Sequence, residues 1–322
     1  MPRVQSQTSI WLTRVAVVVG VFLALQLAVA LGFLLNLRPS LSPPSSHLAD
    51  VATEHGGVHG LSFQTPDDVT LRGELMGEPA VQPVIILAHG YRGTRRDTDR
   101  LAERLLTEGY AVFNFDFRGS GNSDGMLTGL GALEDRDLAA VVAQVQLAYN
   151  VKPGRIAAIG FSMGAVAIAQ AAPDLPKLGA AVLVAPYASL EETIDLRAQR
   201  WVHTAPRPWL TPAFWLSRLL FEIDIPRTEP VAHIGQLAPT PVLLIGSDAD
   251  WRATPAVQKR LLAAAREPKS LKIFQKFDHA ELGRYPSAVA DEIVKFLAAT
   301  LGPGRLPGVG QAEIEVPPAT ER

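Results

Sequence analysis

Two kinds of hydrophobic segment divide this chain. Residues 15–35 form one uncharged run, in which Gln26 is the only strongly polar side chain. Farther along, short apolar runs alternate with stretches in which apolar and charged positions recur at helical spacing. The first kind is long enough to cross ~30 Å of hydrocarbon as a helix, whereas the second is typical of a folded domain.

The long run predicts a single transmembrane anchor, closed by Arg14 on one side and Arg38 on the other. A secretory signal peptide is the first alternative, but its apolar region is normally ~7–15 residues long and ends at a small-residue cleavage site. A buried helix of a soluble domain is disfavoured because the run is apolar on every face. Arg3, Arg14 and the amino terminus make the preceding side more positive, so we expect the rest of the chain to lie outside the cytoplasm.

The chain divides around this run into five parts. We expect an N-terminal flank at 1–14, the anchor at 15–35, a linker at 36–59, a folded domain at 60–301 and a disordered tail at 302–322. The linker is rich in Pro, Ser and Gly, which predicts that it holds the domain away from the bilayer without packing. The tail alternates Pro, Gly and charged residues.

The short apolar runs predict an α/β fold. An antiparallel hairpin is expected within residues 61–71, and helices are expected at 94–106, 133–149 and 287–301. The remaining runs predict buried strands at 84–88, 111–115, 156–159, 180–184, 242–245 and 271–274. Such alternation indicates a mostly parallel sheet flanked by helices, with ligands bound beyond the carboxyl ends of the strands.

Residues 189–237 break this alternation because they contain helical stretches but no obvious strand. The segment is rich in aromatic side chains, namely Trp201, Trp209, Phe214, Trp215 and Phe221. An insertion at this place predicts a helical cap over the ligand-binding edge. Ordinary packing of helices, with the aromatics as core, is the alternative.

Composition narrows the classes of function. The 322 residues, of which 48% are hydrophobic, suffice for one large core. The formal net charge of -2 gives no reason to expect a nucleic-acid partner. The absence of cysteine excludes a disulfide framework, a thiol nucleophile and cysteine-bound metals.

The segment from Gly160 to Gly164 carries the first candidate chemistry. It reads Gly-Phe-Ser-Met-Gly between a strand-like and a helix-like run, which is the context of a nucleophile elbow. In such an elbow a tight turn, eased by glycines, exposes Ser162 at the N-terminus of a helix. A plain strand-to-helix turn is the alternative.

A serine nucleophile needs a base and an acid that orients the base. Of the 7 histidines, His279 lies in an expected loop between the last strand and the closing helix, at the edge that Ser162 occupies. We therefore predict His279 as the base. Asp248 and Asp250 both follow the strand at 242–245, and either carboxylate is within reach of His279.

The developing oxyanion needs two backbone donors. One is the N–H of Met163, directly after the serine, and the other is the N–H of Tyr91, in the loop after the strand at 84–88. Gly90 allows close approach of this loop. His89 is predicted to be a structural hydrogen-bonding residue rather than a second base.

Residues from about 60 to 300 resemble the α/β-hydrolase superfamily, especially serine aminopeptidase-like and monoacylglycerol-lipase-like hydrolases and membrane-anchored relatives of the Bem46 type. The resemblance rests on His89-Gly90, the segment from Asp116 to Ser123, the elbow, and the loops of Asp250 and His279. It implies the α/β-hydrolase fold and serine hydrolysis. In the family the acid commonly stands in a G-x-x-D-x-x-x-P pattern, which favours Asp250 over Asp248. Here Ser247 replaces the glycine, and Pro255 lies one residue late, so Asp248 stays an alternative.

These observations predict a serine esterase that acts on a small acyl substrate, with lipid-like esters favoured by the aromatic cap and the anchor. No metal or organic cofactor is expected. A peptidase on short peptides is one alternative, and Glu191, Glu192 or Asp195 would then bind the free amine. A catalytically silent, membrane-tethered binding domain is another.

Two charged clusters have competing interpretations. Glu134 and Asp137 suggest a metal pair, although acids at the start of a helix more often complement its dipole. The arginines beside the oxyanion loop, Arg92, Arg95 and Arg96, suggest a site for an anionic substrate, and a solvated helix face is the alternative.

Overall fold

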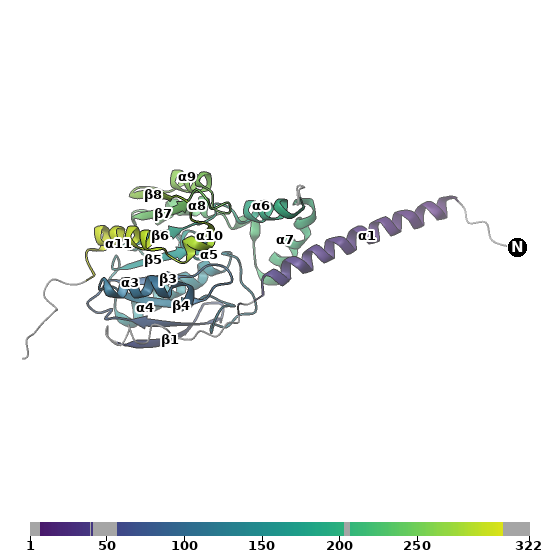
Figure 1. Ribbon diagram of the computed structural model, residues 1–322. Coiled ribbons are helices and arrows are strands. Elements are labelled where there is room, and N and C mark those ends of the chain that lie inside the picture. Colours follow the sequence, from purple (N-terminus) through teal and green to yellow (C-terminus); the bar gives the residue numbers. More distant parts are fainter. Residues whose placement is uncertain (1–6, 39, 41–56, 203–206, 305–322) are drawn as a thin grey trace, which may run out of the picture.

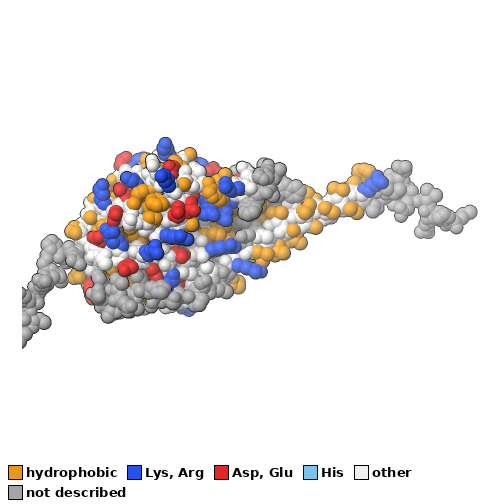
Figure 2. Space-filling model, viewed as in Figure 1, with side chains coloured by type: hydrophobic (Ala, Val, Ile, Leu, Met, Phe, Trp, Pro, Cys, Tyr) orange, Lys and Arg blue, Asp and Glu red, His pale blue; other side chains and the backbone are white. Residues whose placement is uncertain are grey.

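The computed structural model describes residues 7–38, 40, 57–202 and 207–304. Its first element, α1 (Gln7–Asn36), projects from an α/β body and contacts α7 (Arg207–Phe221) near its base (Figure 1). Hydrophobic side chains cover much of the visible face of α1 (Figure 2). Within the described residues, this is the one helix whose length and composition suffice to cross a membrane, over Arg14–Gly32, and little of that stretch is buried.

The body is built on an eight-stranded sheet with the order β1-β2-β4-β3-β5-β6-β7-β8. Strand β2 is antiparallel to β1 and β4, and all other neighbours are parallel. The strands are β1 (Val58–Gln64), β2 (Thr70–Met76), β3 (Val84–Ala88), β4 (Ala111–Asp116), β5 (Ile156–Phe161), β6 (Ala180–Val184), β7 (Val242–Ser247) and β8 (Lys269–Phe274). The hairpin and the mostly parallel sheet predicted from the sequence are thereby confirmed.

Helices cover both faces of the sheet (Figure 1). Because successive strand residues point to opposite faces, Ile86 of β3 joins one core layer and Ile85 joins the other. The first layer includes side chains of α4 (Glu134–Tyr149), α5 (Met163–Gln170) and α9 (Pro255–Ala264). The second includes side chains of α3 (Asp99–Thr107) and α11 (Ser287–Leu301). Burial on both faces explains why the strands read as continuous apolar runs.

The remaining elements refine the sequence-based assignment. The helix predicted at 94–106 is divided into η1 (Arg95–Thr98) and α3, and Thr94 and Asp97 form a capping box at the start of η1. Between β6 and β7 the described residues form helices only, which are α6 (Leu190–Val202), α7, η2 (Ile225–Arg227), α8 (Pro230–His233) and η3 (Ile234–Leu237). Phe214 of α7 is buried and Trp215 is exposed, whereas the side chains of Trp201 and Trp209 lie outside the described set. The role of this segment as a cap stays a prediction.

The residues that follow α1 differ from the expected free linker. Leu37 is fully buried in a cluster with Leu133 and Phe214. The N–H of Ser40 donates to Gly119 O, and its carbonyl accepts from Gly121 N, both at 3.0 Å. The start of the expected linker is therefore packed on the body, because an apolar side chain at 37 completes a core cluster. Residues 41–56 and most of the expected tail, 305–322, lie outside the described residues.

Candidate active site

Ser162 lies at the turn between β5 and α5 with φ 50° and ψ −111°, a strained conformation for a residue with a side chain. The flanking glycines make this turn sterically feasible. A Cβ on Gly160 would lie 2.4 Å from Ala165 N, and one on Gly164 would lie 2.2 Å from Ala88 O. Strand, turn and helix thus have the local geometry expected of a nucleophile elbow.

His279 is the first residue of α10 (His279–Gly283), a short helix where the sequence led us to expect a loop. Asp278 caps this helix, accepting from Glu281 N at 2.8 Å, while Glu281 accepts from Asp278 N at 2.7 Å. The imidazole Nε2 lies 3.0 Å from Ser162 Oγ. The capping box therefore fixes the backbone that presents His279 to the serine.

Asp250 lies behind the imidazole, with its Oδ2 2.7 Å from His279 Nδ1. Its buried carboxylate also accepts from the backbone N–H groups of Arg252, at 2.8 Å, and Ala253, at 3.1 Å. Burial opposes ionisation of Asp250, but the hydrogen bond from His279 and those from the backbone outweigh it and lower its pKa. An ionised carboxylate only accepts, so His279 Nδ1 donates to Asp250. In the tautomer with a single proton on Nδ1, Nε2 accepts from the serine hydroxyl.

The alternative acid, Asp248, is directed elsewhere. Asp248 is exposed, and its Oδ1 accepts from the backbone N–H of Lys276 at 2.7 Å. Among the two aspartates considered from the sequence, the structure therefore brings Asp250 to His279 and leaves Asp248 in a surface turn.

The two expected oxyanion donors lie on the same cavity as Ser162. Met163 is the first residue of α5, where a backbone N–H has no acceptor within its own helix and the helix dipole favours negative charge. Tyr91 lies in the loop that follows β3 and lines the cavity. Beneath it, His89 is fully buried: its Nδ1 donates to Gly90 O at 2.8 Å, and its Nε2 accepts from Phe117 N at 3.1 Å. Burial lowers the pKa of His89, so the neutral ring acts as a hydrogen-bonded brace for this loop.

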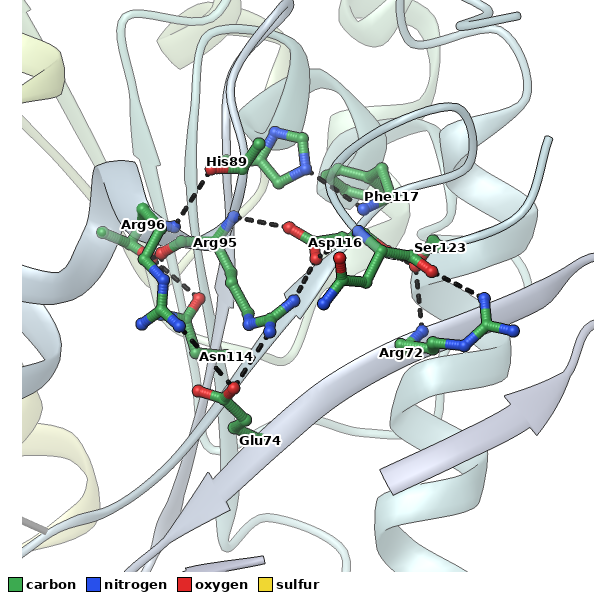
Figure 3. A network of polar contacts seen from close by, with 12 residues as sticks. Arg72, Glu74, His89, Arg95, Arg96, Asn114, Asp116, Phe117 and Ser123 are labelled. Atoms are coloured by element: carbon green, nitrogen blue, oxygen red, sulfur yellow. Dashed lines mark hydrogen bonds and ion pairs between the residues drawn. The ribbon is translucent and has the colours of Figure 1, made fainter. Parts of the chain in front are cut away.

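A network of polar contacts lies next to His89, with the buried pair of Arg95 and Asp116 at its centre (Figure 3). Asp116 accepts from Arg95 N at 2.8 Å, pairs with the Arg95 guanidinium and accepts from Asn122 N at 3.1 Å. Arg95 also pairs with Glu74 at 2.9 Å. The Ser123 hydroxyl donates to Asp116 O at 2.6 Å and accepts from Arg72 N at 2.9 Å. The Asp-x-Arg-Gly-x-Gly-x-Ser segment thus shapes the loop.

The two acids at the start of α4 bind separate partners. Glu134 accepts from the Thr128 hydroxyl at 2.6 Å and from the backbone N–H groups of Gly129 and Gly131 at 2.8 and 2.7 Å. Asp137 pairs with Arg118 at 2.6 Å. Both carboxylates are thus bound by groups of the protein itself. Glu134 and Asp137 therefore do not form the metal pair that was one interpretation of the sequence.

The cavity in front of Ser162 has a volume of about 330 Å³. Tyr91, Met163 and His279 line it together with apolar side chains from α6 and neighbouring loops, among them Leu130, Phe161, Tyr187, Leu190 and Ile194. Three arginines also line it: Arg92, Arg197 and Arg252. In the part of the chain that the structure describes, none of the lining residues is acidic.

Of these arginines, Arg92 was predicted from the sequence as a candidate for binding an anionic substrate, and Arg197 and Arg252 were not. Arg95 and Arg96 are absent from the cavity wall: Arg95 is buried in the network, and Arg96 pairs with Asp99 at 3.2 Å. Arg252 could have been predicted to lie near the site, because it stands two positions after Asp250 in the same loop. Arg197 lies in a charged helix, and nothing in its local sequence separates it from a surface residue.

Comparison with known proteins shows the family of this chain. Residues 79–232 match the family described as serine aminopeptidase, S33. The chain is 32% identical over 219 residues to the uncharacterized protein Rv2307c of Mycobacterium tuberculosis, covering 68% of this chain and 70% of that protein. It is also 32% identical over 100 residues to rhodomycin D methylesterase DauP of a Streptomyces species, covering 31% of this chain and 33% of that enzyme.

A solved structure shares the same architecture. The esterase Pf2001 of Pyrococcus furiosus superposes with a TM-score of 0.65 and 23% identity, covering 83% of this chain and 100% of that one. A mostly parallel sheet, covered by helices on both faces and carrying a serine at a strand-to-helix elbow, defines an α/β hydrolase. The chain belongs to the α/β-hydrolase superfamily.

Proposed function

We propose that this protein is a serine hydrolase that cleaves carboxylic esters through an acyl-serine intermediate. The observation that carries the proposal is the continuous contact from Asp250 Oδ2 to His279 Nδ1, at 2.7 Å, and from His279 Nε2 to Ser162 Oγ, at 3.0 Å, at the wall of a cavity. A hydroxyl, a base and an orienting acid in this order are what nucleophilic acyl transfer requires.

Acylation follows from the protonation states already assigned. His279 Nε2 takes the proton of Ser162 as Oγ attacks the ester carbonyl, and ionised Asp250 stabilises the resulting imidazolium. The carbonyl oxygen becomes an oxyanion that accepts from the N–H groups of Met163 and Tyr91. Each such donor contributes about 3 kcal/mol of transition-state stabilisation. His279 then gives its proton to the leaving alcohol.

Deacylation repeats the sequence with water. His279 takes a proton from water, the hydroxide attacks the acyl-serine, and the proton returns to Ser162 as the acid product leaves. No step in this scheme calls for a further catalytic group.

The cavity favours an ester over a peptide with a free amine. The carboxylates that a peptidase would use are not among the residues that line it. Glu192 pairs instead with Arg260 at 2.7 Å. The similarity to a rhodomycin D methylesterase points in the same direction. The aromatic and apolar lining is compatible with lipid-like acyl groups.

Labelling with a fluorophosphonate probe tests the nucleophile. We expect one adduct on Ser162 in the folded protein and none in Ser162→Ala. Hydrolysis of 4-nitrophenyl butyrate and of a dipeptide 4-nitroanilide, measured side by side, separates esterase from peptidase. Absence of an adduct and of turnover in folded protein would favour a silent binding domain.

We further propose that α1 anchors the domain to a membrane, with the domain on the extracytoplasmic side. The support is the apolar stretch Arg14–Gly32 and the preceding positive charges. Protease treatment of intact cells should digest the domain. Protection until the membrane is permeabilised would reverse the orientation, and release of the domain into the soluble fraction would indicate a cleaved signal sequence.

A further inference from the structure

We propose that Arg92, Arg197 and Arg252 form an anion subsite that selects esters carrying a carboxylate or phosphate group. This inference rests on the proposed serine hydrolase function and adds the chemical class of its substrate. The three guanidinium groups reach the cavity of Ser162 from three separate segments: the loop after β3, helix α6 and the loop after β7.

The charge balance of the cavity is the first support. Among the described residues, its lining has three arginines and no acidic residue, in a chain whose formal net charge is -2. Within the described residues, neither Arg197 nor Arg252 has a carboxylate within 4.0 Å. Figure 2 shows several Lys and Arg side chains on the visible face where the body meets the helices at the base of α1.

Aromatic rings hold two of the guanidinium groups. Arg252 Cζ lies 5.1 Å from the centroid of the Trp251 ring, and Arg92 Cζ lies 5.3 Å from that of Tyr91. A cation over an aromatic face is positioned without being neutralised. The buried Nε of Arg252 has no hydrogen-bond partner in the described structure. Such planar donors suit the bidentate geometry of carboxylate and phosphate oxygens.

Mutual repulsion among the arginines points the same way. Arg197 is exposed, yet partial desolvation lowers its pKa, and the neighbouring charges of Arg252 and Arg92 lower it further. Arg92 also holds a positive φ of 59°, a conformation that is costly for a residue with a side chain. A bound anion would relieve the repulsion, and its contact with guanidinium groups would replace part of its lost hydration.

Paired substrates test the proposal through a ratio. We would measure kcat/KM for mono-4-nitrophenyl glutarate and for 4-nitrophenyl valerate, which share a leaving group and differ in the charge of the acyl end. We expect the glutarate ester to be preferred by about 10- to 100-fold, the range for one charge-assisted hydrogen-bonded contact. The same ratio of kcat/KM is measured for acylglycerol phosphate and monoacylglycerol, which differ in a phosphate group. If the phosphate pair gives the larger ratio, the subsite prefers phosphate, and if the glutarate pair does, it prefers carboxylate.

Variants assign that preference to the arginines. Arg197→Gln and Arg252→Gln should each reduce the anionic-to-neutral ratio by about 10-fold or more, and Arg252→Lys should restore part of it. Arg200→Gln is the matched control, since Arg200 also stacks on Trp251, at 4.4 Å, but does not line the cavity. Sodium chloride at high concentration should lower the ratio for the unmodified protein.

The outcomes separate this inference from the proposed function. Adduct formation on Ser162 and turnover of both esters, with a ratio near one that the variants leave unchanged, would overturn the subsite alone. If neither ester turns over, calorimetry with Ser162→Ala still decides: monoethyl glutarate should bind more tightly than ethyl valerate, and Arg197→Gln should remove the difference. Equal binding would overturn the subsite.

Discussion

The arginines beneath the oxyanion loop and those around the cavity have opposite electrostatic surroundings. Arg95 and Arg118 are buried, and each contacts two carboxylates: Asp116 and Glu74 for the first, Asp67 and Asp137 for the second. Two of the cavity arginines, Arg92 and Arg252, lie over aromatic rings, and the third, Arg197, is close enough to both for their charges to lower its pKa. An arginine side chain therefore pairs with buried carboxylates in one region, whereas in the other region Arg197 and Arg252 have no carboxylate within 4.0 Å among the described residues. This contrast separates side chains that maintain the fold from side chains placed for a ligand.

Substitution of Asp250 has the largest expected effect, because its carboxylate is paired with the imidazole of the proposed base, His279. Asp250→Asn should lower kcat by about 10⁴-fold, since an amide neither fixes the tautomer of His279 nor stabilises its charged form. The control is Asp248→Asn, which should stay close to the unmodified enzyme. Steady-state kinetics on 4-nitrophenyl butyrate measures both, and the reverse order of effects would transfer the role to Asp248.

Substitution of Arg118 tests whether the arginines that pair with buried carboxylates stabilise the fold. Arg118→Gln should lower the free energy of unfolding by about 3–5 kcal/mol, because it leaves the buried carboxylate of Asp137 without its cation. Burial raises the pKa of Asp137 to about 6 even with Arg118 in place. Urea unfolding in detergent measures the loss. Arg104→Gln, which removes exposed pairs with Glu108 and Asp291, should cost less than about 1 kcal/mol. Equal losses would contradict the contrast.

The pH dependence of stability gives a smaller effect. The pKa of Asp250 is held below its ordinary value of 3.8, so its ionised form stabilises the fold above that value. The contribution is lost as the pH falls through the lower, folded value. The difference in unfolding free energy between the unmodified protein and Asp250→Asn should therefore shrink on acidification from pH 4 downward. A difference that grows would reverse the sign of the coupling.

The smallest expected effect belongs to the cavity arginines. Arg197→Gln should change the free energy of unfolding by no more than about 0.5 kcal/mol, since no ion pair is broken and repulsion from Arg252 is removed. The same urea titration measures it. A loss as large as that of Arg118→Gln would place Arg197 in the structural class and remove the electrostatic argument for the anion subsite.

The sequence predicted those features whose signal is local. Apolar runs give the strands, and the glycines around Ser162 give the elbow, because a strained turn restricts its own residues. His279 and the pair of candidate acids, Asp248 and Asp250, followed from chain order and from the edge at which parallel strands end, and the family pattern favoured Asp250. The short helix α10 was missed since its capping box spans only Asp278 to Glu281, and α9 was not assigned.

Features that depend on distant segments could not be predicted. Arg197 and Arg92 are about a hundred positions apart, and only the packing of α6 against the oxyanion side of the body brings them to one cavity. A charged residue on an amphipathic helix has the same pattern whether it faces solvent or a ligand. The choice between Asp250 and Asp248 likewise depended on which carboxylate the turn after β7 buries.

The burial of Leu37 sets where this protein can be shortened. Thr128 N donates to Leu37 O at 3.0 Å, and Thr128 in turn bonds the Glu134 carboxylate that organises the loop bearing Leu130. A chain that starts at residue 41 would leave a void at the Leu37 position. It would also remove the acceptor of the Thr128 N–H and so loosen the segment around Thr128 beside the cavity. The folded body thus begins no later than Leu37, directly after α1, and a shortened version that lacks the apolar helix should retain residues 37–40.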